Sequence, residues 1–328
     1  MAVILVTGAA GFIGSHVAHA LLARGDRVIG LDNLNDYYDV TLKEARLARL
    51  TSLPGFTFRK LDVDDKDKVL ALAADFPDIA GIVHLAAQAG VRHSLVDPYA
   101  YVTANLMGQV VMLELAKSLK GLRHFVYASS SSVYGGNTKT PFSVEDAVDK
   151  PISVYAATKR ADELLAHTYA HLFGIPMTGL RFFTVYGPWG RPDMAAFLFT
   201  RAIVAGEPIT VFNHGQMWRD FTYIDDAVTG VVRALDRPPQ RGEDGGPPIR
   251  VYNLGNNRVE KLTDYIAAIE QALQKKAVMR MAPLQPGDVP KTSADIEASR
   301  HDLGFAPTTP ISVGIPKFVA WFKDYYGV

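Results

Sequence analysis

The chain has 328 residues, with 34 Lys and Arg against 34 Asp and Glu and no cysteine. This length accommodates two domains, and the lack of cysteine excludes disulfides, thiolate metal sites and a cysteine nucleophile. A formal net charge of zero argues against a nucleic-acid or anionic-membrane surface, since both need a basic excess. No apolar run approaches the roughly 20 residues of a membrane-spanning helix, and no signal peptide precedes Val3. We expect a globular, cytoplasmic protein.

The first half of the chain alternates short β-branched runs with segments of helical spacing. Strands are expected at Val3–Thr7, Val28–Asp32, Phe56–Leu61, Ile82–Leu85, Phe125–Ala128 and Met177–Phe183. The apolar residues of most of these runs are continuous rather than alternating, as in strands buried on both faces. Helical spacing is found after Gly11 and over Val102–Leu119 and Val154–Leu172. This alternation predicts an α/β fold of Rossmann type, with a doubly wound parallel sheet.

The second half differs in character. Helices are expected at Ala195–Ala205, Ile224–Leu235, Leu262–Lys275 and Pro310–Tyr326, separated by irregular segments that contain proline. Arg237–Pro248 holds four Pro and three Gly in twelve residues, which is typical of an exposed loop. We therefore expect a smaller, mixed α/β C-terminal domain.

Three glycines follow the first strand. Gly8, Gly11 and Gly14 lie between Val3–Thr7 and a segment with helical spacing. Glycine suits this turn because the chain must reverse tightly, approach a diphosphate closely and pack the helix near the strand. Free N–H groups at the start of the helix, with its dipole, favour an anion there. The pattern predicts a dinucleotide site; the alternative is a cluster of loop glycines without a ligand.

Acidic residues follow two of the strands. Asp32 lies 24 residues after Gly8, where a carboxylate accepts hydrogen bonds from the adenosine ribose hydroxyls and repels a 2′-phosphate, so that NAD is favoured over NADP. Asp62 is a candidate for the adenine edge. The alternative is that Asp32 caps a helix.

A serine run and a Tyr-x-x-x-Lys pair suggest acid–base chemistry. Ser130 lies near the carboxyl end of a buried strand, where open α/β sheets bind ligands. Tyr155 and Lys159 share one face of an expected helix. A phenol with a pKa of about 10 is a poor base at neutral pH, but a neighbouring ammonium stabilises the phenolate. Tyr155 could then remove a hydroxyl proton while Ser130 donates a hydrogen bond to the oxygen.

At this point the chain resembles a known family. The segments TGAAGFIG (7–14), HLAAQAGVR (84–92), ASSSSVYG (128–135), YAATK (155–159), RFFTVYGP (181–188) and PGDV (286–289) are similar to extended short-chain dehydrogenase/reductases that act on nucleotide sugars. NLNDYYD (33–39), HLAAQAGVRHS (84–94) and RFFTVYGPWGRPDMA (181–195) resemble UDP-glucuronate 4-epimerases in particular.

The resemblance implies a reaction and a cofactor. UDP-glucuronate and UDP-galacturonate would be interconverted through a 4-keto intermediate with tightly bound NAD⁺, rotation of the sugar and reduction on its other face. Residues 1–180, rejoined by parts of 218–258, would bind NAD, and 181–328 would bind the nucleotide sugar. The resemblance also implies a homodimer. The implied catalytic residues are Ser130, Tyr155 and Lys159; the last two also contact the cofactor, with Gly8, Gly11, Phe12, Ile13, Gly14, Asp32, Asn33, Asp62, Val63, Leu85, Ala86 and Ala87.

Departures from related enzymes favour a uronate substrate. Related dehydratases carry an Asp-Glu pair after the catalytic hydroxyl residue, and related decarboxylases carry a Glu before VYG; here Ser131 and Ser132 stand there. Thr184 replaces the Asn of many relatives. These three hydroxyls would suit a C6 carboxylate. The full set expected to contact substrate is Gln88, Arg92, Ser131, Ser132, Thr184, Arg191, Arg219 and Asp288, and Asn105 is a weaker candidate for the active site.

Other functions remain as alternatives: a 4-epimerase of neutral UDP-hexoses, a decarboxylating UDP-glucuronate enzyme, or a non-catalytic NAD(H)-binding regulatory protein. No metal site is predicted. His167 and His171 have the spacing of two zinc ligands, but the glutamate of HExxH is missing and no third ligand suggests itself.

Overall fold

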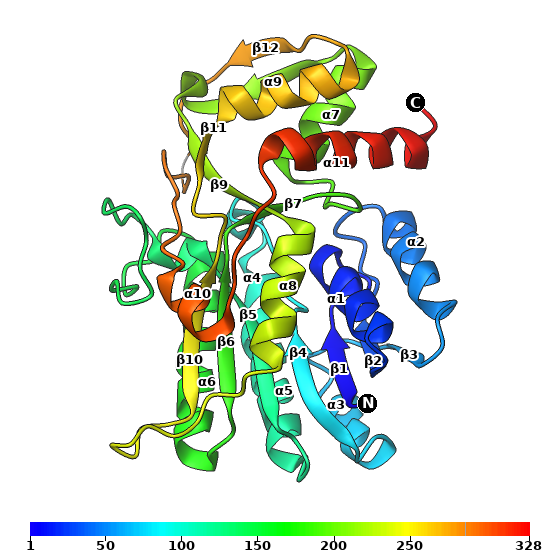
Figure 1. The fold of residues 1–328 in the computed structure, drawn as a ribbon, viewed down its shortest axis with the longest axis vertical. Helices are drawn as coiled ribbons and strands as arrows, with labels where there is room; N and C mark the ends of the chain where they lie inside the picture. The colour runs from blue at the N-terminus through cyan, green and yellow to red at the C-terminus, as the bar shows by residue number, and fades with distance from the viewer. Residues whose placement is uncertain (286) are drawn as a thin grey trace.

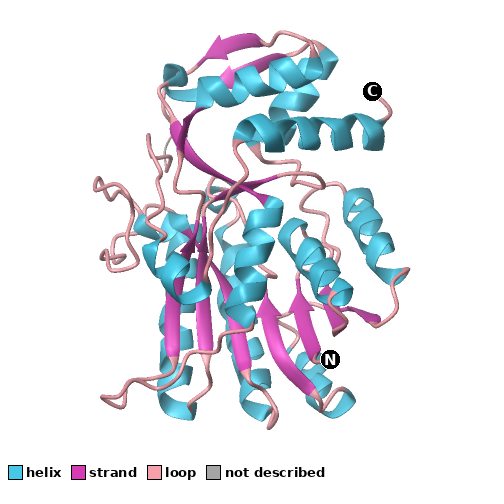
Figure 2. Ribbon diagram, viewed as in Figure 1, coloured by secondary structure: helices cyan, strands magenta, loops and turns pink. Residues whose placement is uncertain are grey.

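The computed structural model describes residues 1–285 and 287–328. A seven-stranded sheet has the order β10-β6-β5-β4-β1-β2-β3, and all its neighbouring strands are parallel (Figures 1 and 2). The strands are β1 (Val3–Thr7), β2 (Arg27–Asp32), β3 (Phe56–Lys60), β4 (Ile79–His84), β5 (His124–Ser130), β6 (Met177–Phe182) and β10 (Ile249–Leu254). The expected α/β fold with a Rossmann-type sheet is confirmed.

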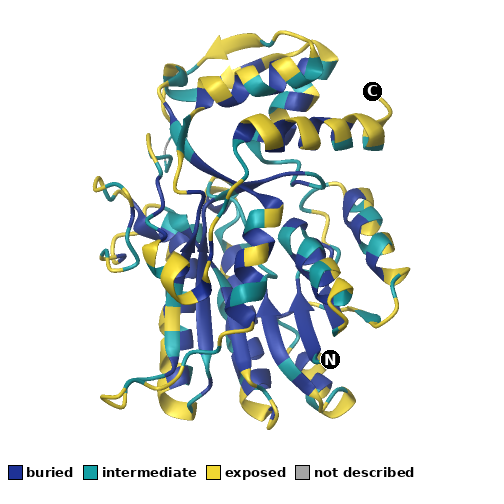
Figure 3. Cartoon of the chain, in the orientation of Figure 1, coloured by how far each residue is buried: buried dark blue, intermediate teal, exposed yellow. Residues whose placement is uncertain are grey.

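Helices cover both faces of this sheet (Figure 1). One side has α1 (Phe12–Ala23), α2 (Val40–Thr51) and α8 (Ile224–Leu235), and the other has α3 (Lys66–Asp75), α5 (Gly108–Ser118) and α6 (Val154–Phe173). Along β1, Ile4 and Val6 belong to the first hydrophobic core, whereas Val3 and Leu5 belong to the second. A strand buried on both faces explains the continuous apolar run in the sequence, and Figure 3 shows the central strands of the sheet as buried, whereas the edge strands β3 and β10 include exposed residues.

The helix expected over Val102–Leu119 is wrong in detail. The structure has a short helix α4 (Pro98–Tyr101), a π-helical stretch η2 (Val102–Met107) and then α5. Asn105 lies in the π-helical stretch, 1% exposed, and its amide bonds the backbone of Gln88 and the Thr158 hydroxyl. Periodicity does not reveal such a widened turn, which often occurs beside functional sites.

Most of the C-terminal elements lie over the carboxyl ends of the large sheet, whereas α10 (Glu297–Leu303) packs against β10 and α8 (Figure 1). The C-terminal elements comprise β7 (Thr184–Tyr186), α7 (Ala195–Ala205), β8 (Pro208–Val211), β9 (Trp218–Tyr223), β11 (Val259–Lys261), α9 (Leu262–Leu273), β12 (Val278–Met281), α10 and α11 (Ile311–Tyr326). Short 3₁₀ turns of three or four residues occur at η1 (His93–Leu95), η3 (Ser131–Tyr134) and η4 (Phe212–Gly215). The loop expected at Arg237–Pro248 contains no helix or strand. The division into domains at residue 180 stays a prediction.

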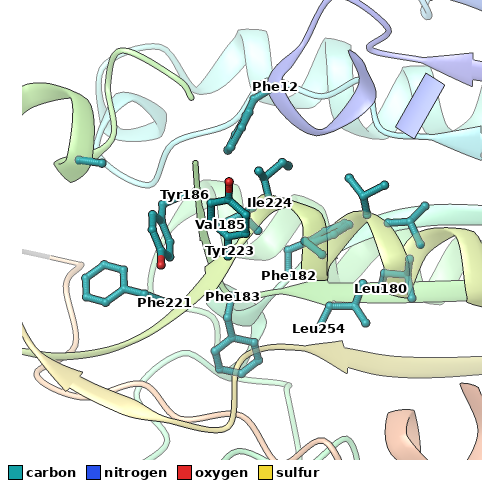
Figure 4. Packing of buried hydrophobic residues seen from close by; sticks show 14 of the residues in the cluster. Phe12, Leu180, Phe182, Phe183, Val185, Tyr186, Phe221, Tyr223, Ile224 and Leu254 are labelled. Atoms are coloured by element: carbon teal, nitrogen blue, oxygen red, sulfur yellow. The ribbon is translucent and has the colours of Figure 1, made fainter. Parts of the chain in front are cut away.

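An aromatic cluster joins the two parts of the chain. Figure 4 shows Phe12, at the start of α1, facing Val185, Tyr223 and Ile224. Phe221 stacks on Tyr265 with ring centroids 3.9 Å apart. This packing fixes the first turn of α1 against the strands that follow β6. Within the described ranges, no helix has the length and apolar character to cross a bilayer.

His124 is a buried structural histidine. Its Nδ1–H donates to the Leu235 carbonyl at 3.0 Å, and its Nε2 accepts from the Thr178 hydroxyl at 2.9 Å. Burial lowers the pKa of His124 to about 4. The ring is therefore neutral and links β5 to β6 and α8.

We expect His124 to weaken the fold in mild acid. Between the unfolded pKa of about 6.5 and the folded one, the unfolded chain binds more protons, so stability is lost as pH falls through this window. From pH 7 to pH 5 the loss from this ring is about 2 kcal/mol. In urea unfolding, the free energy of unfolding of His124→Gln should fall by about 2 kcal/mol less between pH 7 and pH 5 than that of the unmutated protein. The exposed His171→Gln is the control. An identical slope in His124→Gln and the unmutated protein would contradict the assignment.

Candidate active site

The glycine turn brings two backbone segments unusually close. Gly8 has φ +69°, which glycine adopts without strain, and a Cβ on it would lie 2.9 Å from the Ala86 nitrogen. A Cβ on Gly14 would lie 2.0 Å from the Gly8 carbonyl oxygen. Helix α1 starts after Gly11 with no side-chain cap on its first N–H groups. The turn thus presents free backbone donors at a helix N-terminus, an arrangement that binds anions.

Asp32 is tied to this turn. One of its carboxylate oxygens accepts from the Ala10 N–H at 3.0 Å, and the other accepts from the Leu34 N–H at 2.9 Å. The Asn33 amide donates to Asp62 at 2.9 Å. The hydrogen bonds fix the orientation of the Asp32 carboxylate and leave it lone pairs for further donors, as recognition of a ribose requires.

The reactive side chains come from β5 and α6. Ser130 ends β5, and its Oγ accepts from the Ser132 N–H at 3.2 Å. Tyr155 lies in the first turn of α6, which Ser153 caps by accepting from the Ala156 N–H at 3.1 Å. The structure places Ser129 and Ser130 inside the strand rather than after it, because β5 is longer than the expected Phe125–Ala128.

Lys159 is held in a buried environment. It is 3% exposed, and its Nζ lies 3.0 Å from a carboxylate oxygen of Asp162. Burial raises the pKa of Asp162 to about 6, against the opposing charge of Lys159. The ion pair with Asp162 holds Lys159 one helical turn beyond Tyr155.

His84 lies beside this ion pair without adding charge. The Thr7 hydroxyl oxygen accepts from the Leu85 and Ala86 N–H groups, so its proton donates to His84 Nδ1 at 2.7 Å. Burial, with the charge of Lys159, lowers the pKa of His84 to about 3. The imidazole is therefore neutral beside Lys159.

One cavity of about 800 Å³ connects these groups. It runs from the glycine turn past Tyr155 to the C-terminal elements. Every residue expected to contact cofactor or substrate lines it: Gly8, Gly11, Phe12, Ile13, Gly14, Asp32, Asn33, Asp62, Val63, Leu85, Ala86, Ala87, Gln88, Arg92, Ser130, Ser131, Ser132, Tyr155, Lys159, Thr184, Arg191, Arg219 and Asp288. Asn105 does not line it and instead braces Gln88 from behind.

Three of the expected arginines line the cavity, Arg92 and Arg219 near Asp288 and Arg191 beside Asp193. Arg191 Nε lies 3.0 Å from Asp193. Arg92 forms an ion pair with Asp288 at 3.0 Å. Burial lowers the pKa of Arg219, although Asp288 opposes the shift. Such a group of guanidinium ions suits a diphosphate. Within the PGDV segment, Pro286 lies outside the described residues.

Several lining residues were not expected from the sequence. Lys43 enters the cavity from α2, with its Nζ 2.6 Å from the Asn35 carbonyl. Phe212 supplies an aromatic face beneath Arg92, 4.6 Å from its guanidinium carbon to the ring centroid. The NLNDYYD segment before α2 is the one signal that could have pointed to Lys43. In residues 1–285 and 287–328, no three or more His, Cys, Asp or Glu side chains are placed to hold a metal ion.

Comparison with known proteins places this geometry in context. The sequence profile of the NAD dependent epimerase/dehydratase family matches residues 4–255. UDP-glucuronate 4-epimerase 2 of Arabidopsis thaliana is 49% identical, with 98% of this chain and 76% of that protein aligned. A probable UDP-glucuronate 4-epimerase of Rhizobium meliloti is 46% identical, over 98% and 97% respectively. A crystal structure of UDP-glucuronic acid 4-epimerase from Bacillus cereus, in complex with UDP-glucuronic acid and NAD, has a TM-score of 0.90 at 37% identity and covers 99% of this chain and 100% of that one.

We expect Gly14→Ala to damage the glycine turn. The added methyl group meets a backbone carbonyl, which cannot move away as a side chain can. Overpacking of this kind costs about 1–3 kcal/mol of unfolding free energy, and the displaced turn should lose dinucleotide affinity. Thermal unfolding and the amount of NAD on the purified protein measure both effects. Gly121→Ala, where nothing lies within 4 Å of the new Cβ, is the control. Unchanged NAD content in Gly14→Ala would contradict the account.

Proposed function

The chain belongs to the NAD dependent epimerase/dehydratase family, and we propose that it interconverts UDP-glucuronate and UDP-galacturonate by inverting C4 of the sugar. The observation that carries this proposal is the single cavity, which unites a dinucleotide turn, a Ser-Tyr-Lys group and three small hydroxyls suited to a uronate. The relatives named above, aligned over almost the whole chain, support the same reaction.

The residues of the chain fit NAD⁺. A Cβ on Gly14 would fill the close contact between α1 and the turn, α1 begins with uncapped N–H groups, and Asp32 faces the same cavity. Gly8, Gly11 and Gly14 would admit the diphosphate, and Asp32 would accept the adenosine ribose hydroxyls. When bound, NAD⁺ supplies a reversible hydride acceptor, so that the reaction needs no net oxidant.

Tyr155 acts as the base and then the acid. Its phenol removes the proton from the O4 hydroxyl of the sugar and returns it after the sugar has turned over. Lys159, held by Asp162, lowers the free energy of the phenolate. Ser130 donates a hydrogen bond to O4 and so holds the oxygen as it becomes a ketone.

The C6 carboxylate makes the 4-keto intermediate prone to decarboxylation. A 4-keto uronate is a β-keto acid, and it loses CO₂ readily when the bond from C5 to the carboxylate aligns with the π system of the ketone. Ser131, Ser132 and Thr184 line the cavity and offer hydrogen bonds without a full charge. These hydroxyls hold the carboxylate out of that alignment. Arg191 and Arg219 bind the diphosphate of the UDP group.

Alternative functions are disfavoured by specific residues. A decarboxylase of this family is expected to carry a Glu where Ser132 stands. A 4-epimerase of neutral UDP-hexoses has no use for three hydroxyls around C6. A regulatory NAD(H)-binding protein has no need of Ser130, Tyr155 and Lys159 together.

We also propose a homodimer and a cytoplasmic location. Apolar side chains that are about half exposed or more gather on neighbouring elements: Tyr99 (81%) on α4, Val102 (48%) and Met107 (54%) on the π-helical stretch, and Leu164 (54%) and Leu172 (63%) on α6. Exposed apolar surface of this extent is typical of an interface, and a second copy of the chain is the occupant that we propose.

Tyr155→Phe removes the proposed proton acceptor and little else. We expect kcat for UDP-glucuronate to fall by about 10²–10⁴-fold, with little change in KM. NMR of the sugar anomeric signals measures the conversion. Tyr169→Phe is the matched control, since that hydroxyl lies on the same helix but bonds Glu114 at 2.6 Å. A kcat for Tyr155→Phe close to that of the unmutated enzyme would rule out the phenol as base.

Thr184→Ala tests the role of the hydroxyls at C6. With one donor removed, the carboxylate is less restrained, and we expect more UDP-pentose side product or a higher KM for UDP-glucuronate. Thr184→Ser keeps the hydroxyl and should stay near the unmutated values. If both product ratio and KM are unchanged in Thr184→Ala, Thr184 does not hold the carboxylate.

A further inference from the structure

Arg46 is the largest fully buried side chain of the described residues, at 0% exposure. It projects from α2 and makes five hydrogen bonds, which use every N–H donor of a guanidinium. The acceptors are the carbonyls of Ala10, Trp189 and Gly190 and the Tyr38 hydroxyl. All of them are uncharged. Within the described part of the chain, no carboxylate forms an ion pair with Arg46.

The acceptors belong to two segments that are far apart in the sequence. Ala10 lies in the glycine turn, and its carbonyl accepts from Nη1 at 3.2 Å. Its N–H donates to Asp32, so both backbone polar groups of Ala10 are engaged. Trp189 and Gly190 lie in the 187–193 loop, which carries Arg191; their carbonyls accept at 2.7 Å and 3.0 Å from Nη2. One guanidinium thus links the dinucleotide turn to a loop of the substrate half.

The 187–193 loop needs this support. Trp189 has φ +64°, a region that bulky residues rarely adopt. Its carbonyl accepts from both Nε and Nη2 of Arg46, while its ring lies against Trp321 at 5.3 Å between centroids and beneath Arg49 at 4.7 Å. The hydrogen bonds to Arg46 hold the unusual backbone conformation from which Arg191 emerges two residues later.

Among the described residues the charge of Arg46 is only partly offset: Asp32 opposes the fall in the pKa of Arg46 but forms no ion pair with it. A buried cation whose acceptors are all neutral is costly, because the lost hydration is not replaced by an opposite charge. Burial lowers the pKa of Arg46, the direction that this cost dictates. The glycine turn above it is the point at which an anionic diphosphate would bind, and such an anion would supply the missing negative charge.

We propose that Arg46 is a positioning residue that couples the two ligands: it joins the glycine turn to the 187–193 loop and places a buried positive charge beneath the dinucleotide diphosphate. A dinucleotide that orders the turn therefore also orders the loop that presents Arg191 to the nucleotide sugar. By thermodynamic linkage, a nucleotide diphosphate bound at the loop must hold the dinucleotide more tightly. The proposal rests on the proposed function only for the choice of UDP as a probe.

The test measures release of NAD from the full-length protein as purified, without and with saturating UDP. In the unmutated protein we expect UDP to slow release by about 10-fold, within the usual range of such couplings. Arg46→Lys keeps the charge but cannot form the planar set of bonds, so the effect of UDP should fall to about twofold or less. Arg46→Met removes charge and bonds, and should also release NAD faster than Arg46→Lys without UDP. Arg49→Met, which removes a neighbouring positive charge and the contact with the Trp189 ring but none of the hydrogen bonds of Arg46, should keep the effect of UDP.

The outcomes are distinguishable. If UDP slows NAD release equally in Arg46→Lys and in the unmutated protein, the coupling is overturned. It is also overturned if the unmutated protein binds UDP but releases NAD at the same rate with and without it. The second result needs only the unmutated protein, so it would overturn the coupling even if both Arg46 variants fail to fold. If UDP does not stabilise the unmutated protein against heat at all, the proposed function fails instead.

Discussion

Parallel strand pairing is the constraint on which the site depends. Because all seven strands of the large sheet run in one direction, their carboxyl ends meet at one edge. The glycine turn follows β1, Asp32 ends β2, His84 ends β4 and Ser130 ends β5. The C-terminal elements have only to cover this edge to enclose a cavity, which residues from both parts of the chain line.

Charged and neutral side chains are buried close together around the cavity. Burial and the charge of Lys159 keep His84 neutral, while Lys159 forms a buried ion pair with Asp162. Because His84 is neutral, the side chain that ends β4 adds no positive charge beside Lys159. Among the described residues Arg46, unlike Lys159, forms no ion pair with a carboxylate, and the proposed diphosphate would add negative charge beside it.

Local patterns carried most of the prediction. The glycine spacing, the acidic residue after β2 and the Tyr-x-x-x-Lys pair are each encoded within one turn or one strand end, and all these residues line the cavity. Other features depend on contacts between distant segments. No short pattern indicates that Arg46 meets Trp189, that Phe212 lies beneath Arg92, or that β10 pairs with β6. The π-helical stretch around Asn105 was missed because hydrophobic spacing does not distinguish it from an α-helix.

The central claim is that one carbon of a uronate sugar is oxidised and reduced again within this cavity. The most direct measurement incubates UDP-glucuronate carrying deuterium at C4 with the purified protein, adds no NAD⁺, and follows the products by NMR. The account predicts UDP-galacturonate that retains the deuterium at C4. Loss of the label to water, or formation of a UDP-pentose with release of CO₂ as the main product, would contradict it.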